Sequence, residues 1–148
     1  MKIEEQFTVA APIQRVWEFI TSAEDVAACI PGCEGVETIE EGKYKASIKI
    51  GVGPIKTTFK VDVEAVEQRP PNFAKYATKG EEGGRASRIN AESTLTLSET
   101  ADGQTEVAYT SDVSIVGRLG KFGLGVMKKK AKGIGEEFAA NIAKQLEG

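Results

Sequence analysis

The central part of the chain alternates between apolar and polar residues over several successive segments. Residues 43–50 alternate in this way, and residues 55–65 do so again after the Gly- and Pro-containing turn at 51–54. Further segments of this kind follow at residues 73–79, 89–97 and 107–115. A strand turns successive side chains to opposite faces, and short turns join neighbouring strands in antiparallel order. The pattern therefore predicts an antiparallel sheet with one wet face and one face that another element must cover.

The N-terminal part predicts one further strand and two short helices. Residues 2–9 alternate and are expected to form the first strand. Proline is tolerated in the first turn of a helix, so residues 11–12 indicate a helix start. This helix carries an apolar stripe at helical spacing, made of Ile13, Val16, Trp17 and Ile20. A second short helix is expected over residues 23–29, where the Pro-Gly pair at 31–32 stops it.

Residues 116–146 read as a long amphipathic helix, although the first half of this segment carries four glycines. They are Gly117, Gly120, Gly123 and Gly125. Each interior glycine costs a helix about 1 kcal/mol relative to alanine. A helical wheel gives one predominantly apolar face, made of Gly120, Gly123, Leu124, Met127, Ala131, Ile134, Phe138 and Ile142. We therefore expect one α+β domain over residues 1–148, with a curved sheet of about six or seven strands around this helix.

The apolar face of the predicted helix changes character along its length. Phe138 and Ile142 are bulky and suit core packing, whereas the N-terminal half carries small residues and Met127. Small residues opposite a concave sheet leave a void, and packed interiors tolerate few voids. We expect a hydrophobic ligand to fill that space. The alternative is that the glycines let the helix and the sheet approach closely, which would leave no cavity.

Strand alternation names the residues expected to contact such a ligand. From the sheet they are Ile48, Phe59, Val61, Tyr76, Ile89, Ala91, Leu95, Tyr109 and Val113, and from the helix Gly120, Gly123, Leu124, Met127 and Ala131. Tyr109 is the polar group expected to bind the ligand, because a buried phenol needs a hydrogen-bond partner. A backbone group is an equally suitable partner, and Tyr76 is a second candidate.

A second side of the same segment carries Leu119, Phe122 and Val126. This apolar flank is rimmed by lysines, namely Lys121, Lys128, Lys129 and Lys130. An exposed apolar patch with a cationic rim is typical of a surface that meets an anionic membrane or a partner protein. In the alternative reading, these side chains cap the end of the sheet and the lysines only solvate the helix.

The composition excludes several classes of function. The chain has no histidine, so it has no Ser-His-Asp or Cys-His triad and no imidazole metal ligand, and we expect neither catalytic residues nor a metal site. Cys29 and Cys33 lack the other ligands of a zinc site and are expected to be free thiols, with a reversible disulfide between them as the alternative. The net charge of −3 does not favour nucleic acid. With no apolar stretch of about 20 residues and no signal peptide, a cytoplasmic location is expected.

Four stretches of the sequence form a recognisable combination. They read FTVAAPIQRVWEFI, CIPGCEGVE, KYKASIKIGVGPIKTTFKVDVE and VGRLGKFG. Together they resemble the carbon monoxide dehydrogenase G-subunit family of the START-like (SRPBCC) superfamily, and the resemblance extends from Met1 to Leu146. It implies a helix-grip fold with a deep apolar cavity between the sheet and the terminal helix.

The resemblance also implies a cellular context. Members of the family are associated with aerobic molybdenum CO dehydrogenases and related hydroxylases, in membrane recruitment or in handling a quinone. The implied ligand is a lipid or a quinone such as menaquinone, and the implied location includes peripheral contact with the inner face of the cell membrane. Some members attach to the membrane through an extension beyond the domain, which the printed sequence, ending at Gly148, does not include. The molybdenum, iron-sulfur and flavin centres are expected in other subunits.

Three functions compete at this point. The first is a non-catalytic carrier of a hydrophobic molecule, an accessory to such an oxidoreductase. The second is a cyclase or hydrolase of aromatic substrates, which would need a carboxylate or tyrosine aimed into the cavity. Alternation places Asp62, Glu64, Glu92 and Asp112 outward, which argues against this second function. The third is a docking module that acts only through the flank of Leu119, Phe122 and Val126.

Overall fold

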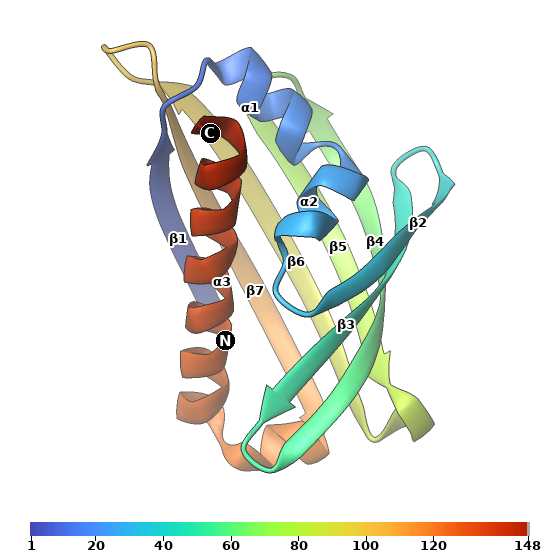
Figure 1. The fold of residues 1–148 in the computed structure, drawn as a ribbon. Coiled ribbons are helices and arrows are strands. Elements are labelled where there is room, and N and C mark those ends of the chain that lie inside the picture. The colour runs from blue at the N-terminus through green and yellow to red at the C-terminus, as the bar shows by residue number, and fades with distance from the viewer. Residues whose placement is uncertain (148) are drawn as a thin grey trace.

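The computed structural model describes residues 1–147, apart from the side chain of Arg85. Seven strands, three α-helices and two 3-10 turns follow one another along these residues (Figure 1). In chain order they are β1 (Lys2–Val9), α1 (Ile13–Ile20), α2 (Ala23–Cys29), β2 (Cys33–Glu40), β3 (Lys43–Val52), β4 (Ile55–Arg69), β5 (Phe73–Glu82), η1 (Gly83–Arg85), β6 (Ser87–Glu99), β7 (Thr105–Gly117), η2 (Arg118–Phe122) and α3 (Leu124–Glu147).

All seven strands form one antiparallel sheet. Its order is β1-β7-β6-β5-β4-β3-β2, so that β2 to β7 are neighbours in sequence order and β1 pairs with β7. The sheet curves around α3, and α1 and α2 cover its remaining inner face at the upper end (Figure 1). This arrangement confirms the predicted α+β helix-grip fold.

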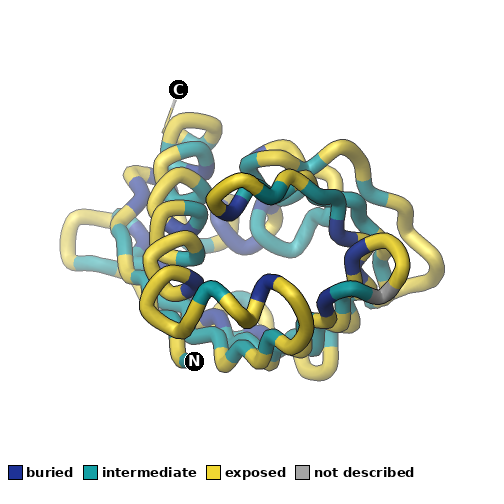
Figure 2. Tube along the Cα trace, turned by 90° about the horizontal axis from the view of Figure 1, so that it is seen from below, coloured by how far each residue is buried: buried dark blue, intermediate teal, exposed yellow. Residues whose placement is uncertain are grey.

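The inner face of the sheet follows the predicted alternation. Thr78, Ala91 and Val113 lie opposite one another on β5, β6 and β7 and face the interior. Their sequence neighbours Glu92 and Asp112 are exposed. A register shift in β4 comes only after Ala65, so it does not reverse the parity of the residues before it. Figure 2 shows the result along the chain, where buried and intermediate positions alternate with exposed ones.

The core is divided between the two ends of the sheet. At the upper end α1 packs on the sheet through a cluster of Val9, Ala11, Val16, Trp17, Ala74, Leu95, Leu97 and Val107. At the lower end the cluster contains Val52, Phe59, Val61, Leu119 and Met127. Ile142 of α3 joins Phe19 and Cys29 in a third, smaller cluster. The middle of the inner face, between these clusters, is where the interior can hold a ligand.

The predicted single helix over residues 116–146 is wrong in its first part. Strand β7 continues to Gly117, η2 follows, and α3 begins only at Leu124. Gly117 has φ +102° and Gly123 has φ +89°, in the left-handed region that favours glycine. A Cβ at Gly117 would lie 2.1 Å from the carbonyl oxygen of Ala86, so this approach requires glycine. Both residues therefore serve turns at the two ends of η2 and not the helix interior.

A buried carboxylate holds η2 against the sheet. Glu82 is 2% exposed and accepts hydrogen bonds from Arg118 Nε at 2.9 and 3.0 Å, from Arg118 Nη2, and from the hydroxyls of Thr57 and Ser87. Ser87 Oγ in turn accepts from the backbone N–H of Leu119 at 3.1 Å. The hydrogen bond with Arg118 is the main reason that the pKa of Glu82 falls to about 2, with Ser87 and Thr57 adding to it against the opposing effect of burial. The network fixes the position from which α3 starts.

Candidate functional site

An apolar cavity of about 460 Å³ lies between the sheet, α2 and the middle and C-terminal parts of α3. Its wall includes residues from β1 to β7 and from all three α-helices. They are Ile3, Phe7, Ile20, Thr21, Ala23, Val26, Ala27, Ile30, Cys33, Val36, Tyr44, Ala46, Val63, Tyr76, Thr78, Ser93, Thr94, Leu95, Val107, Tyr109, Ser111, Ala131, Ile134, Gly135, Phe138 and Ile142. We call this space the upper cavity. Its size and its mostly apolar lining are those of a small-molecule site.

The part of α3 that lines the upper cavity is not the part that the sequence indicated. Ala131 was expected there, but Ile134, Gly135, Phe138 and Ile142 line it as well. The bulky residues therefore both pack the core and border the cavity. Because α3 begins only at Leu124, its middle part, from Ala131 to Ile142, is the part that faces the upper cavity.

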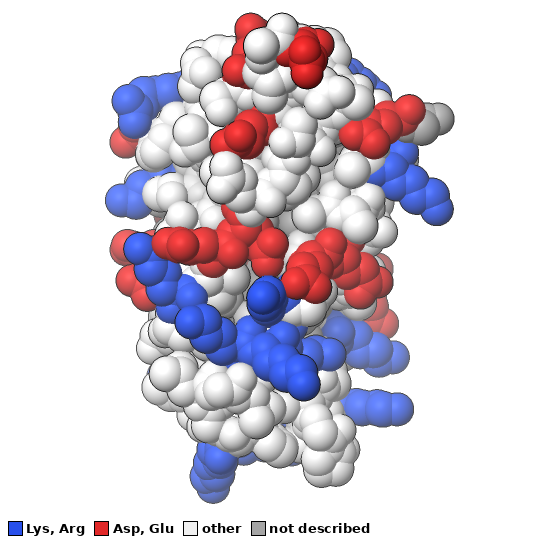
Figure 3. All heavy atoms as spheres, turned by 90° about the vertical axis from the view of Figure 1, so that its left-hand side faces the viewer, with Lys and Arg blue, Asp and Glu red and all other residues white. Residues whose placement is uncertain are grey.

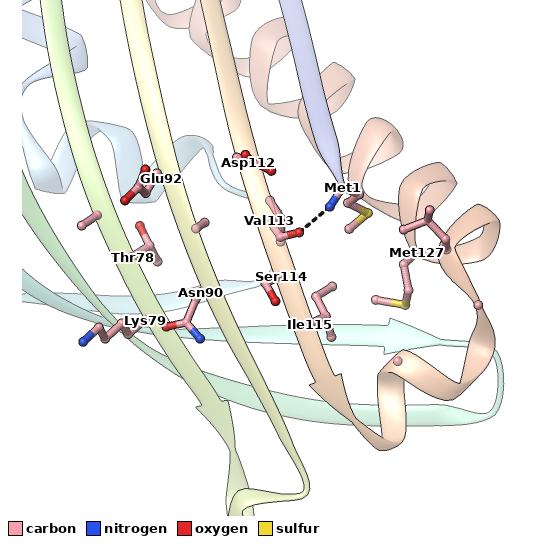
Figure 4. A pocket seen from close by; sticks show the side chains of 15 residues that line it. Met1, Thr78, Lys79, Asn90, Glu92, Asp112, Val113, Ser114, Ile115 and Met127 are labelled. Atoms are coloured by element: carbon pink, nitrogen blue, oxygen red, sulfur yellow. Dashed lines mark hydrogen bonds between the residues drawn. The ribbon is translucent and has the colours of Figure 1, made fainter.

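A second space of about 700 Å³, the lower pocket, lies near the start of α3. Its lining includes Met1, Ala77, Thr78, Lys79, Asn90, Ala91, Glu92, Asp112, Val113, Ser114, Ile115, Gly120, Gly123, Leu124 and Met127. Figure 4 shows Met1, Ile115 and Met127 gathered near α3, with Lys79 and Asn90 along β5 and β6 on the other side. The N-terminal amine of Met1 donates to the carbonyl of Val113 at 2.6 Å. Thr78 borders both spaces, so they meet on β5.

The structure distributes the predicted ligand-contacting residues over these spaces. Tyr76, Leu95, Tyr109 and Ala131 line the upper cavity, whereas Ala91, Val113, Gly120, Gly123, Leu124 and Met127 line the lower pocket. Val61 and Ile89 border a third, more polar groove of about 1140 Å³. Phe59 is fully buried in the lower cluster and Ile48 packs against that cluster, so neither lines any of these spaces. Leu124 was predicted to face inward and borders the lower pocket, but it is 67% exposed.

The predicted apolar flank is wrong for Leu119, which is 1% exposed. Leu119 lies in η2 beneath the sheet and completes the lower cluster, which is the capping role of the alternative reading. Phe122 is half-buried against the same cluster, with its ring beside Gly53. Val126 is exposed, as are Lys128 and Lys129. Within α3 the exposed large apolar side chains are therefore Leu124 and Val126.

Tyr109 combines a cavity position with an unusual neighbour. A Cβ on Gly135 of α3 would lie 2.6 Å from the Tyr109 hydroxyl and 3.4 Å from a carboxylate oxygen of Glu5. Burial, with a further contribution from the charge of Glu5, raises the pKa of Tyr109 to about 12. The phenol is therefore protonated at neutral pH. Sequence reasoning missed Glu5, although it has the same parity in β1 as Ile3 and Phe7.

Two serines add a second polar group to the upper cavity. Ser93 and Ser111 lie opposite each other on β6 and β7, and their hydroxyl oxygens are 2.8 Å apart. One O–H is used between them, so the pair keeps one donor and several lone pairs for a ligand. Both serines alternate in step with Leu95 and Tyr109, which were predicted to face inward. They were not predicted as ligand contacts, because a small polar residue in a strand does not by itself indicate binding. Burial raises the pKa of Tyr76, the second predicted phenol, against the effect of a hydrogen bond with Gln68.

The model of the carbon monoxide dehydrogenase G-subunit family, CoxG, matches residues 6–147. This chain belongs to the CoxG family. The match includes every strand and helix around the two spaces, with only the first residues of β1 outside it. The search of curated proteins found no match.

Solved structures show the same fold for this member of the CoxG family. A conserved protein from Geobacillus kaustophilus is 26% identical, with a TM-score of 0.91 over 99% of this chain and 95% of the other. A START superfamily protein from Mycobacterium smegmatis is 12% identical, with a TM-score of 0.72 over 99% and 97%. The Zhui aromatase/cyclase from Streptomyces sp. R1128 is 18% identical, with a TM-score of 0.64 over 99% and 90%. The last two likenesses establish the fold alone.

The remaining chemistry of this CoxG family member is limited. Cys29 and Cys33 are both free thiols, and burial, followed by the charge of Asp25, raises the pKa of Cys29. Among residues 1–147, with the Arg85 side chain left aside, no group of three or more Cys, Asp or Glu side chains is arranged to hold a metal ion. No helix in the described part of the chain has the length and hydropathy to cross a membrane.

Proposed function

We propose that this protein is a non-catalytic binder of a hydrophobic molecule, a quinone such as menaquinone or a lipid. The observation that carries the proposal is the upper cavity, whose walls are mostly apolar and whose volume of about 460 Å³ is in the range of ligand sites. A hydrophobic molecule that fills a space of that size removes the apolar wall from water, which is favourable. The few polar groups in the wall would fix the orientation of a ring oxygen.

The proposed context follows from the family. Membership of the CoxG family supports an accessory role beside a CO dehydrogenase or a related molybdenum hydroxylase, in quinone delivery or membrane recruitment. The protein would act in the cytoplasm, at the inner face of the cell membrane. Its ligand would link the enzyme to the electron carriers of the bilayer.

Identification of the bound molecule tests the proposal directly. The protein is purified under native conditions, extracted with organic solvent, and the extract is examined by mass spectrometry. We expect a quinone or lipid in near-stoichiometric amount. A protein that carries no such molecule, and that cannot be loaded with menaquinone or phospholipid, would exclude this function.

One observation favours an enzyme as the second candidate. Glu5 and Tyr109 lie close together beside the upper cavity, which is the pairing of carboxylate and phenol that cyclisation or hydrolysis of an aromatic substrate would use. A pKa of about 12 makes Tyr109 a hydrogen-bond donor and a poor general acid at neutral pH. This candidate would be established if the protein turned over a poly-β-keto or aromatic ester substrate and Glu5→Gln abolished that turnover. Tight binding without turnover favours the carrier.

A further inference from the structure

The charges of the chain are strongly segregated. The 23 residues between Asp112 and Glu136 contain six cations and no acid: Arg118, Lys121, Lys128, Lys129, Lys130 and Lys132. The whole chain has 19 basic and 22 acidic residues, so the remainder has 13 basic against 22 acidic residues, a net charge of −9. On the face that Figure 3 shows, a cluster of basic groups lies below a band of acidic groups and above a mostly uncharged area, with further basic groups along the edges. The lower end is thus cationic on an otherwise acidic protein.

The first residues of α3, which lie at this cationic end, are exposed and apolar. We call residues 123–126 the α3 tip. Leu124 is 67% exposed and Val126 is 48% exposed. A Cβ at Gly123 or Gly125 would meet nothing within 4 Å. Residues 124 and 126 are about 200° apart on a helix of 3.6 residues per turn, so both sides of the tip carry an aliphatic group. Much of the surface of both side chains is therefore open to the surroundings.

The lower pocket reaches the α3 tip. Its lining includes Gly123 and Leu124, together with Met127 one turn further along the helix. Met127 is 8% exposed and belongs to the lower cluster, so the lining runs from the exposed tip to the protein interior. Thr78 borders both the lower pocket and the upper cavity. The tip therefore borders a pocket that adjoins the candidate ligand site.

We infer that the α3 tip docks on an anionic lipid bilayer, with Leu124 and Val126 inserted among the lipids and the neighbouring lysines on the headgroups. Aliphatic side chains on opposite sides of a helix end suit a fluid apolar medium better than the single face of a protein partner. The lysines add attraction to anionic headgroups. The acidic remainder of the chain is repelled by the same surface, which fixes the orientation. This inference rests on the proposed function, because it places the pocket that adjoins the upper cavity against the source of a hydrophobic ligand.

Vesicle binding tests the docking surface. Co-sedimentation is measured with phosphatidylcholine vesicles that contain either no anionic lipid or about 30 mol % phosphatidylglycerol. We expect at least tenfold stronger binding to the anionic vesicles, and a loss of at least tenfold with the triple variant Lys128→Glu, Lys129→Glu, Lys130→Glu. Val126→Asp should lose at least about fivefold. Val66→Asp is its matched control, since Val66 is 55% exposed on β4, and it should bind as the unchanged protein does.

Insertion is measured separately with a fluorescent reporter. Leu124→Trp is compared with Val66→Trp in vesicles that contain brominated lipid, and the fluorescence of the buried Trp17 is subtracted. Quenching of the tryptophan at position 124 alone supports the inference. Equal quenching at both positions, equal binding to neutral and anionic vesicles, or a triple variant that loses a protein partner but binds vesicles unchanged would each overturn it.

These outcomes are separable from those of the proposed function. A protein that binds anionic vesicles through the α3 tip but carries and accepts no hydrophobic molecule contradicts the carrier and leaves the docking surface standing. A protein that carries a quinone or lipid but ignores vesicles, or binds them independently of the tip, contradicts the docking surface only.

Discussion

The hydroxyl oxygens of Ser93 and Ser111 lie 2.8 Å apart, across two paired strands, in the wall of a cavity that is otherwise mainly apolar. A hydroxyl pair in such a wall satisfies only part of its own hydrogen-bonding capacity. Its unused donor makes it the simplest recognition element for a carbonyl oxygen in the ligand. The alternative is a purely structural role, since cross-strand hydroxyl pairs stabilise sheets modestly.

Replacement of either serine separates these two roles. We expect Ser93→Ala or Ser111→Ala to weaken binding of 2-methyl-1,4-naphthoquinone by about 2- to 10-fold, the equivalent of one neutral hydrogen bond. The double variant should lose less than the sum of the two, because the partners share one bond. Isothermal titration calorimetry measures the effect, with the exposed Thr96→Ala on the same strand as the control. Equal affinity in all variants would make the pair purely structural.

Filling the upper cavity should remove ligand binding without harming the fold. Ala131 lines the cavity, so Ala131→Leu places extra methylene groups in that space, and each one buried contributes about 0.8 kcal/mol. We expect an affinity loss of at least about tenfold with no loss in the free energy of unfolding. Ala140→Leu, exposed on the same helix, is the control and should bind normally. If Ala131→Leu instead destabilises the protein, the cavity is closed in solution.

Gly135 and Gly133 offer a matched comparison on α3. Nothing lies within 4 Å of a Cβ at Gly133, so Gly133→Ala should stabilise the protein by about 1 kcal/mol through helix propensity. A Cβ at Gly135 would meet the Tyr109 hydroxyl at 2.6 Å, and Gly135→Ala should gain nothing or destabilise. Tyr109→Phe removes that oxygen, so the gain should return in the double variant. Chemical denaturation measures all four stabilities, and equal gains at both glycines would contradict the contact.

The Glu82–Arg118 pair should make stability depend on acid pH. The pKa of Glu82 is lowered from 4.5 to about 2 in the folded protein, so the stabilisation is present above pH 4.5 and is lost as the pH falls to about 2. Glu82→Gln should flatten that dependence and cost about 1–3 kcal/mol at neutral pH. Denaturation curves between pH 2 and 7 test this. Glu67→Gln breaks the exposed Arg69–Glu67 pair in the same way and should change stability by less than about 1 kcal/mol.

Much of the fold follows from local pattern. Alternation placed the inner and outer faces of the sheet correctly, since a strand repeats every two residues wherever it lies. Glu5, Ser93 and Ser111 occupy inward positions of the same alternation. They could therefore have been predicted as candidates from the sequence, as polar residues at inward positions. Their proximity to a cavity could not be read, because it depends on which strands pair and where α3 crosses them.

Residues 116–124 show the opposite case. On a helical wheel they belong to one helix, but Gly117 is constrained by the carbonyl of Ala86, a residue far away in the sequence. That contact ends β7, starts η2 and delays α3 to Leu124. As a consequence Leu119 is buried, Leu124 is exposed, and α3 faces the upper cavity from Ala131 to Ile142.

Local pattern predicted six of the seven strands, their faces, the need for a covering helix and the family, but it missed β2 (Cys33–Glu40). Where the helix begins, which residues line the cavity and which side chains stay on the surface depend on the tertiary contacts. The two groups of features differ in the range of the interactions behind them. Alternation and propensity act between neighbours, whereas Gly117 against Ala86, Glu82 with Arg118 and Gly135 against Tyr109 join residues that only the folded chain brings together.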